Sequence, residues 1–382
     1  MSDAQTVAEA FLGVYGRPAT GVWSAPGRVN LIGEHTDYTE GVVFPFAIDR
    51  RAFIAAARND DSVLRIQSLQ RPDELIEVAI ADLVPRGDHH WSSYVAGSVW
   101  ALRDAGHDVQ GFDLILDSTV PSGSGLSSSA ALECATMLVA AGLYDVPVDA
   151  FAFALLAQRS ENLYVGVPCG SMDQTASMMG KEGAALFYDT QNGDIALEPF
   201  EPGVAGLALL VIDTRVHHAH ADNEYAQRRE GCEEAARQLG VPSLRHITAD
   251  GLPAALAKLD ADLGRHVSHV VSENDRVFAS RIALRDGDYV ELGRLLNASH
   301  ASLKDVFRVS ADELDVACDA ARSAGALGAR MTGGGFGGSA IALVAIDGID
   351  ELSDAVRRAY EEHGYDEPSI WVVEPSDGAH QD

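Results

Sequence analysis

Residues 121–129 read PSGSGLSSS and lie between a predicted strand and a predicted helix. Residues 112–116 before them follow a strand pattern, and residues 127–143 are mostly apolar at helical spacing. The glycines allow close approach of the backbone, and the serines favour a helix start whose free N–H groups and dipole attract an anion. A nucleotide phosphate is one such anion, and a capped helix start without a ligand is the alternative. The segment is not a Walker A loop, because GxxxxGK followed by Ser or Thr occurs nowhere in the chain.

The pattern of predicted elements changes near the middle of the chain. Strands dominate the first half, and they are predicted at residues 41–45, 52–58, 63–68, 75–78, 112–116, 184–188, 195–197 and 207–213. Helices dominate the second half, and they are predicted at residues 223–239, 266–284, 288–307, 311–324 and 350–363, with strands at 327–331, 339–345 and 370–374. Earlier helices are predicted at 7–15 and 149–165. This order favours a two-domain α+β protein, divided into residues 1–200 and 205–382.

The chain is strongly acidic. Its 28 Lys+Arg and 57 Asp+Glu residues give a net charge of −29, which repels nucleic acid and anionic lipid surfaces. The four cysteines form no CxxC pair, so reduced thiols are expected. The apolar stretches are too short to span a bilayer. We therefore expect a cytoplasmic protein that binds neither nucleic acid nor a membrane.

The densest polar segment is PGRVNLIGEHTDY at residues 26–38. Glu34, His35 and Asp37 place three strong hydrogen-bonding side chains close together. Carboxylates that accept hydrogen bonds from adjacent hydroxyls commonly hold a neutral sugar, and Arg28 is suited to steady charge on a transferring phosphoryl group. Apolar residues flank the cluster, so we expect it to line a cavity. A solvated loop with local pairing is the alternative.

A second glycine-rich loop, TGGGFGG at residues 332–338, formally contains GxGxxG. A dinucleotide-binding fingerprint opens a helix, whereas residues 339–344 read as a strand, so a nicotinamide-dependent oxidoreductase is excluded. A glycine-rich hairpin between two strands instead brings its backbone close to a large neighbour. A plain sheet connection is the alternative.

Two acidic residues are further candidates. Glu161 ends a helical pattern and is suited to bind magnesium. Asp173 begins another helix and is suited to act as a base. Taken alone, each has a simpler alternative: Glu161 on a solvated helix face, and Asp173 as a favourable charge in a first helical turn.

Together these segments resemble the GHMP family of small-molecule kinases. Residues 123–130 are similar to the ATP loop of the family, and residues 332–338 to its C-terminal glycine motif, both of which homoserine and mevalonate kinases share. Residues 27–38 resemble the signature of the galactokinase branch, to which the run GEHTDY is specific. The resemblance covers essentially the whole chain. It implies an N-terminal domain with a mixed sheet, a C-terminal domain with an antiparallel sheet and helices, and an active site in the cleft between them.

The resemblance also implies a role for each matched residue. The residues implied in sugar binding are Glu34, His35, Thr36, Asp37, Gly170 and Tyr225. Those implied in ATP binding are Ser68, Gly123, Ser124, Gly125, Leu126, Ser127, Ser128 and Ser129. Ser129 and Glu161 are the implied ligands of Mg²⁺. Asp173 is the implied catalytic base, and Arg28 is implied to stabilise the transition state and to orient Asp173.

The reaction that the resemblance implies is ATP-dependent phosphorylation of α-D-galactose at its C1 hydroxyl, the entry step of galactose catabolism. The expected partners are galactose and MgATP, and the expected state is a monomer or a weak dimer. Two alternatives stay open: a kinase for a related sugar such as N-acetylgalactosamine, and a galactose-sensing regulator without catalysis. The presence of Arg28, Ser129, Glu161 and Asp173 argues against the regulator.

Overall fold

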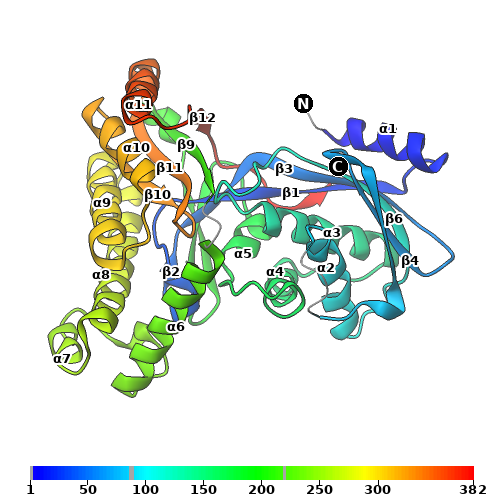
Figure 1. Cartoon of the computed structure of the whole chain (residues 1–382), viewed down its shortest axis with the longest axis horizontal. Helices are drawn as coiled ribbons and strands as arrows, with labels where there is room; N and C mark the ends of the chain where they lie inside the picture. Colours follow the sequence, from blue (N-terminus) through cyan, green and yellow to red (C-terminus); the bar gives the residue numbers. More distant parts are fainter. Residues whose placement is uncertain (1–2, 86–89, 218–220) are drawn as a thin grey trace.

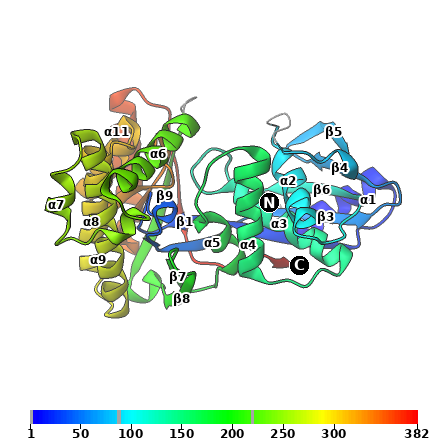
Figure 2. The ribbon, with the colours of Figure 1, turned by 90° about the horizontal axis from the view of Figure 1, so that it is seen from below.

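The computed structural model describes residues 3–85, 90–217 and 221–382. The molecule has two parts that lie side by side (Figure 1). The N-terminal part comprises β1–β8, α1–α5 and the last strand β13, and the C-terminal part comprises β9–β12 and α6–α11. Figure 2 shows the same division from below. The mixed and antiparallel sheets, with helices packed beside them, confirm the predicted α+β class. No described helix has both the length and the apolar composition of a membrane span.

The N-terminal part is built on a six-stranded sheet in the order β13-β1-β3-β6-β4-β5. Its strands are β1 (Gly21–Asn30), β3 (Pro45–Arg58), β4 (Val63–Ser68), β5 (Arg71–Ala79), β6 (Phe112–Ser118) and β13 (His380–Gln381). β4 and β6 pair in parallel and the other neighbours are antiparallel, so the sheet is mixed as predicted. The helices of this part are α1 (Ala4–Tyr15), α2 (Ser93–Asp104), α3 (Ser128–Tyr144), α4 (Ala150–Arg159) and α5 (Met172–Met179).

Strand β3 shows how the two faces of this sheet are covered. Successive side chains of a strand point to opposite faces. Ala55 and Ala57 belong to the cluster that contains Phe11 of α1. Ile54 and Ala56 belong to the cluster that the side chains of α2 and α3 fill. The sheet therefore lies between α1 on one face and α2 and α3 on the other, as Figure 1 shows.

The C-terminal part is built on an antiparallel sheet in the order β10-β11-β9-β12. Its strands are β9 (Leu207–His217), β10 (Gly328–Thr332), β11 (Gly337–Ala345) and β12 (Ser369–Val373). Its helices are α6 (Ala221–Leu239), α7 (Leu252–Leu256), α8 (Ala261–Arg285), α9 (Tyr289–Ala301), α10 (Asp312–Ser323) and α11 (Ile349–His363). On β9, Leu210 and Ile212 join the core under these helices, whereas Leu209 and Val211 join a core shared with the N-terminal part.

The two parts are joined by buried residues and by the end of the chain. The shared core contains Leu31 and Phe44 from the N-terminal part and Ile341 from the C-terminal part. A small sheet of β2 (Val42–Val43), β7 (Ala184–Asp189) and β8 (Asp194–Pro199) lies where the two parts meet, because β7 packs on β3 and α8 packs on β2 and β8. After β12 the chain returns to the first sheet, where Gln381 of β13 pairs with Trp23 of β1. The division of the sequence into residues 1–200 and 205–382 stays a prediction.

Several predicted elements differ from the observed ones for local physical reasons. β1 is absent from the predicted pattern because Pro26 and Gly27 interrupt it, and the strand tolerates them through a register shift between Pro26 and Arg28. α2 was also not predicted. The helix predicted over residues 149–165 is α4 followed by the π-helical turn Ser160–Val165, and the one predicted over 288–307 is α9 followed by the π-helical turn Ser302–Phe307.

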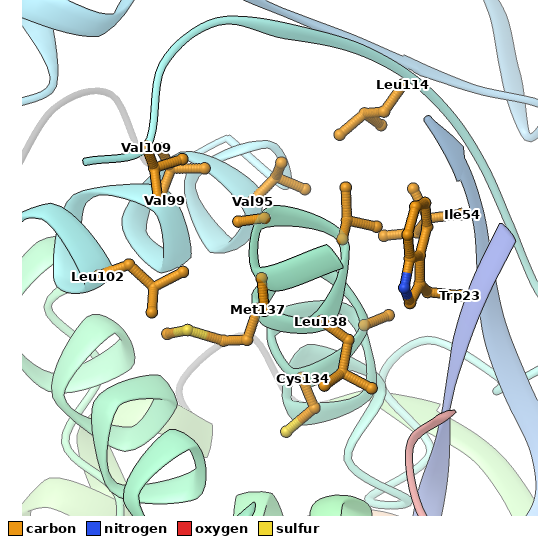
Figure 3. Packing of buried hydrophobic residues seen from close by; sticks show 14 of the residues in the cluster. Trp23, Ile54, Val95, Val99, Leu102, Val109, Leu114, Cys134, Met137 and Leu138 are labelled. Carbon is orange, nitrogen blue, oxygen red and sulfur yellow. The ribbon is translucent and has the colours of Figure 1, made fainter. Parts of the chain in front are cut away.

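The position of α3 depends on its contact with Trp23 of β1. Figure 3 shows Trp23 beside Ile54 of β3, with Leu138 of α3 packed near both. Gly142 near the end of α3 leaves room for the indole, because a Cβ at this position would lie 2.5 Å from Cζ2 of Trp23. Burying a large apolar side chain contributes about 1.5–3 kcal/mol, so this contact is a substantial part of the docking of α3 on the sheet.

We predict that Gly142→Ala lowers the free energy of unfolding by about 1–3 kcal/mol, because the added methyl group overpacks the indole of Trp23. The matched control is Gly13→Ala in α1, where no atom lies within 4 Å of the added Cβ. There the usual preference of a helix for alanine should raise stability by up to about 1 kcal/mol. Thermal and urea unfolding of the two variants measure the difference, and a stabilised Gly142→Ala variant would contradict the packing argument.

Candidate active site

A cavity of about 240 Å³ lies between the two parts, where the polar segment and the two glycine-rich loops meet. Of the residues predicted for the site, the cavity is lined by Arg28, Glu34, His35, Asp37, Gly123, Gly125, Gly170, Asp173 and Tyr225. The C-terminal glycine motif adds residues 333–336 to the wall. Segments that are about 300 residues apart in the sequence therefore line one cavity.

The loop at residues 121–129 ends at the N-terminus of α3, as predicted. Ser127 is the residue before the helix and has a left-handed backbone with φ of 60°. Its side chain does not cap the helix, contrary to the sequence expectation, because its hydroxyl donates to the carboxylate of Asp173. The first N–H groups of α3 are thus left without a cap from this residue, which suits an anion-binding helix start.

An ion pair between Arg28 of β1 and Asp173 of α5 lies at the centre of the site. The guanidinium Nε and Nη2 donate to the two carboxylate oxygens of Asp173, each at 2.9 Å. Nη1 donates to the carbonyl oxygen of Gly125 at 2.6 Å. The Arg28 side chain is 5% exposed and that of Asp173 is 25% exposed, so the carboxylate is the accessible member of the pair. This bidentate geometry fixes the orientation of the carboxylate toward the cavity.

The carboxyl group of Glu34 is buried, and residues of the C-terminal part bind it. Its Oε1 accepts from the N–H of Gly333 at 2.8 Å, and Nη2 of Arg330 lies 3.2 Å from the same oxygen. Burial raises the pKa of Glu34, and the positive charges of Arg330 and Arg28 oppose that rise. The carboxyl group thus depends on these arginines for its charge.

Asp37 and Gly170 lie against each other in the wall of the cavity. A Cβ on Gly170 would lie 1.8 Å from Oδ2 of Asp37, so only glycine leaves room for this carboxylate. The N–H of Met172 donates to the same oxygen at 3.4 Å. Burial and the nearby charge of Asp173 raise the pKa of Asp37 to about 6. The two carboxylates of Asp37 and Asp173 therefore repel each other in the site.

The side chains of His35 and Thr36 make their hydrogen bonds within the protein. The ring nitrogens of His35 already have protein partners: Nε2 donates to the carbonyl oxygen of Gly334 at 3.0 Å, and Nδ1 accepts from the hydroxyl of Tyr38 at 2.8 Å. Burial lowers the pKa of His35 to about 3, which keeps the ring neutral. Thr36 is buried, and its hydroxyl lies against the carbonyl oxygens of Gly33 and Val42.

The rings of the site form an aromatic wall. The ring of Tyr225 lies 5.2 Å from that of His35 and 5.6 Å from that of Tyr38. His35 is also 5.0 Å from Phe307. His35 and Tyr225 thus shape the cavity, and Thr36 fixes the fold of the loop from beneath. Their roles as direct sugar ligands stay predictions.

Ser129 and Glu161, the predicted magnesium ligands, lie together behind Asp173. Glu161 is 6% exposed on the π-helical turn after α4. Burial and the charge of Asp173 raise its pKa to about 7, whereas a hydrogen bond from Ser129 opposes that rise. Nε2 of Gln174 donates to Glu161 Oε2 at 2.6 Å. A hydroxyl and a carboxylate beside each other are the hard oxygen donors that Mg²⁺ prefers.

The other predicted ATP-binding residues do not line this cavity. The hydroxyl of Ser68 at the end of β4 donates to Oε1 of Gln70 at 2.7 Å. Ser124 donates to the carbonyl oxygen of Pro121 at 2.8 Å and so stabilises the loop itself. Leu126 is buried in the shared core, and its carbonyl oxygen accepts from the N–H of Arg28 at 3.0 Å. Ser124 and Leu126 thus support the loop itself, Ser68 bonds within the turn after β4, and the ATP-binding roles of all three stay predictions.

Sequence reasoning missed two polar residues at the site. Arg330 contacts Glu34 and precedes the glycine motif by two positions. Gln174 follows Asp173 and joins Glu161 to the buried Glu133, whose Oε2 accepts from Nε2 of Gln174 at 3.1 Å. The available signal was a charged residue within an otherwise apolar strand for Arg330, and adjacency to the candidate base for Gln174.

Comparison with known proteins agrees with this geometry. Residues 9–58 match the model of the galactokinase galactose-binding signature. Residues 93–181 and 280–365 match the N-terminal and C-terminal domain models of the GHMP kinases. The chain is 48% identical to the galactokinase of Streptomyces coelicolor, over 98% of both chains. This chain belongs to the galactokinase family.

Other galactokinases support the same assignment. The galactokinase of Mycobacterium tuberculosis is 43% identical over 94% of this chain and 98% of its own. A crystal structure of Lactococcus lactis galactokinase complexed with galactose matches with a TM-score of 0.94 and 34% identity, over 98% of both chains. Mevalonate kinase of Methanococcus jannaschii shares the fold, with a TM-score of 0.67 and 18% identity over 93% of this chain and 98% of its own.

We predict that Asp37→Asn stabilises the protein above neutral pH. Folding raises the pKa of Asp37 from its ordinary value of 3.8 to about 6, so the ionised carboxylate opposes folding above pH 6. The variant should gain about 1–3 kcal/mol in the free energy of unfolding at pH 8. The gain should shrink as the pH falls through 6 toward 3.8, because the carboxyl group is then protonated in both states.

Urea unfolding of both proteins at pH 8 and pH 5 measures this change. The control is Asp60→Asn, which removes an exposed carboxylate between β3 and β4. The prediction fails if Asp37→Asn is no more stable than the parent at pH 8, or if its gain is equal at both pH values.

Proposed function

We propose that the chain transfers the γ-phosphoryl group of ATP to the C1 hydroxyl of α-D-galactose, giving α-D-galactose 1-phosphate and ADP. The observation that carries the proposal is the Asp173 carboxylate, held by Arg28 between the carboxyl groups of Glu34 and Asp37 and the loop at the start of α3. Membership of the galactokinase family supports the choice of sugar and phosphate donor.

The sugar would bind through its hydroxyls. Glu34 and Asp37 supply acceptor oxygens in a cavity of about 240 Å³, and the aromatic rings of His35 and Tyr225 form an apolar wall. A neutral sugar is not repelled by acidic groups, whereas a negatively charged substrate would be. Glu34 and Asp37 are therefore suited to orient galactose, and the rings are suited to cover an apolar face of it.

Phosphoryl transfer has a loose transition state, so positioning and neutralisation of charge do most of the catalysis. The N–H groups at the start of α3 and the glycine backbone of residues 123–125 are suited to hold the phosphates. Arg28 adds a fixed positive charge beside the reacting groups. The same guanidinium holds the general base, so attraction of the phosphoryl group and alignment of the base come from one residue.

Asp173 would accept the proton of the sugar hydroxyl. As the C1 oxygen forms its bond to the γ-phosphorus, the bond from that phosphorus to the bridging oxygen of ADP breaks, and the hydroxyl proton moves to a carboxylate oxygen of Asp173. Both of these oxygens already accept hydrogen bonds from Arg28, which fixes the carboxylate in place. Such alignment can be worth several powers of ten in rate.

Ser129 and Glu161 are the residues that would hold Mg²⁺. The buried Glu161 carboxyl group and the hydroxyl of Ser129 beside it form a donor set that fits this ion. When bound, the ion neutralises charge on the β- and γ-phosphates. Gln174 fixes the orientation of the Glu161 carboxyl group through its hydrogen bond to Oε2.

A second cavity of about 470 Å³ is suited to the base of the nucleotide. It shares Val167 and Pro168 with the first cavity, and Trp91 and Tyr94 supply aromatic surface on its wall. Flat bases stack on such side chains without specific hydrogen bonds.

We further propose that the enzyme acts in the cytoplasm, where its four cysteines would stay free, and that it is a monomer or a weak dimer.

ADP release by the purified protein, measured with galactose, N-acetylgalactosamine and other hexoses, is the experiment that tests the function. We expect turnover with galactose to exceed that with the other sugars. A preference for an N-acetyl sugar would replace galactose as the substrate, and galactose binding without ADP release would indicate a sensor.

We predict that Asp173→Asn lowers kcat by roughly 10²–10⁴-fold, because the amide cannot accept the hydroxyl proton. Folding and the affinity for ATP should stay close to those of the parent. The measurement is galactose-dependent ADP release together with ATP binding. Asp113→Asn is the matched control, because Asp113 is a buried carboxylate that accepts from Arg17 and Arg65 away from the site. Near-normal turnover of Asp173→Asn would remove this residue from the mechanism.

We also predict a strict requirement for Mg²⁺, since a chain of net charge −29 has no broad positive surface for a nucleotide. Excess EDTA should abolish turnover. Ser129→Ala and Glu161→Gln should each raise the Mg²⁺ concentration for half-maximal turnover by roughly tenfold or more, as expected for the loss of a charge-assisted contact. Mg²⁺ titrations at fixed ATP measure this, and substantial turnover in EDTA would overturn the prediction.

A further inference from the structure

Arg330 is a fully buried arginine beside the site. It lies on β10, and its side chain is 0% exposed. Nη1 donates to the carbonyl oxygen of Leu31 at 3.0 Å. Nε and Nη2 have no hydrogen-bond acceptor of good geometry among the described residues. The carboxylate oxygen Oε1 of Glu34, 3.2 Å from Nη2, is thus the ion-pair partner of this guanidinium, whose charge also helps to lower the pKa of the buried Glu273.

Three groups from the end of β10 converge on that one oxygen. The N–H of Gly333 donates to Oε1 of Glu34 at 2.8 Å, the hydroxyl of Thr332 lies at 3.3 Å, and Arg330 supplies the positive charge. Oε1 is therefore committed to protein donors. Glu34 lines the cavity, so its other carboxylate oxygen, Oε2, remains for a ligand, with the side chain of Asn30 as the further polar neighbour of the carboxyl group.

We propose that Arg330 is a positioning residue for the sugar: it holds the Glu34 carboxylate ionised and oriented so that Oε2 accepts from a galactose hydroxyl. The proposal deepens the function proposed above and rests on it. Arg330 does not touch the sugar, and it acts through Glu34.

The chemistry of a buried pair explains why this arginine matters to binding. A buried ion pair often stabilises a fold no better than apolar residues of the same size, so stability alone gives little reason for a guanidinium here. An ionised acceptor, however, makes stronger hydrogen bonds to hydroxyls than a neutral one. Burial favours the neutral form of Glu34, and Arg330 is the first of the charges that oppose it. A carboxylate fixed before the sugar arrives also loses less entropy on binding.

The site then contains two arginine–carboxylate pairs with separate tasks. Arg28 of β1 orients the Asp173 carboxylate that accepts the proton. Arg330 of β10 orients the Glu34 carboxylate that binds the sugar. Loss of Arg28 should therefore reduce the rate of transfer, whereas loss of Arg330 should reduce the affinity for galactose. This division separates a positioning role from a general structural one.

Isothermal titration with galactose in the absence of ATP, combined with steady-state kinetics, tests the proposal. Arg330→Met should weaken galactose binding by roughly 10- to 100-fold, the range expected when a hydrogen bond to a charged group is lost. The KM for ATP, and kcat at saturating galactose, should stay near those of the parent. Unchanged galactose affinity, or a fall in kcat without a change in affinity, would overturn the proposal.

A double-substitution cycle shows whether Arg330 acts through Glu34. In a Glu34→Gln background, Arg330→Met should weaken galactose binding little further, because the charge it serves is already absent. Losses that simply add would overturn the proposal. The double variant also removes both members of the buried pair, so it avoids an unpaired charge in the interior.

Should Arg330→Met fail to fold, Arg330→Lys keeps the positive charge without the planar guanidinium, and it should weaken galactose binding by a smaller factor.

The matched control is Arg51→Met. Arg51 is another buried arginine, and it donates to the carbonyl oxygens of Asp377 and Gly378 near the end of the chain. Its loss should lower thermal stability and leave galactose affinity unchanged; an equal loss of affinity in this control would overturn a specific role for Arg330. If the parent does not bind galactose, the proposed function fails. If the parent binds galactose and Arg330→Met binds it equally well, this inference alone fails.

Discussion

The arrangement of the site depends on the hydrogen bonds that the guanidinium of Arg28 donates. Through its side chain it joins three separate elements: β1 that carries it, α5 through the carboxylate of Asp173, and the loop before α3 through the carbonyl oxygen of Gly125. Each of these elements is anchored in the shared or N-terminal core. Because the guanidinium is planar and its donors have fixed directions, the three elements are aligned to within the tolerance of a hydrogen bond.

The charge of the chain and the charge of the site are arranged on different scales. At −29 the whole chain repels a polyanion, yet the cavity contains one guanidinium, a glycine backbone and the start of a helix. These groups act over a few ångströms, whereas the net charge acts over the Debye length of about 8–10 Å. The proposed nucleotide site thus relies on local geometry, and the proposed binding of a neutral sugar beside Glu34 and Asp37 needs no positive surface.

Much of the fold follows from local patterns in the sequence, whereas the roles of most site residues rest on the family resemblance and stay predictions. The strand, loop and helix around residues 112–143, and the hairpin of β10 and β11, are set by periodicity and glycine content within a short window. Arg330 could not be found in this way, because its partner Glu34 lies about 300 residues away. β1 escaped prediction because pairing along both of its edges outweighs the local cost of Pro26. The sugar-binding roles of His35 and Thr36 rest on the family resemblance and stay predictions, and in the folded loop the hydrogen-bonding groups of both side chains have protein partners.

The C-terminal glycine motif shows how such distant groups come together. A Cβ on Gly333 would lie 2.7 Å from the carbonyl oxygen of Gly125, and one on Gly338 would lie 3.0 Å from that of Ser124. Ser339 donates to the same Ser124 oxygen at 2.7 Å. The absence of side chains thus lets the hairpin rest on the loop before α3, and this contact brings the N–H of Gly333 to Glu34. A bulkier motif would separate the two parts of the molecule. The groups proposed to bind the sugar and the phosphates are therefore spaced by the packing of one glycine backbone on another.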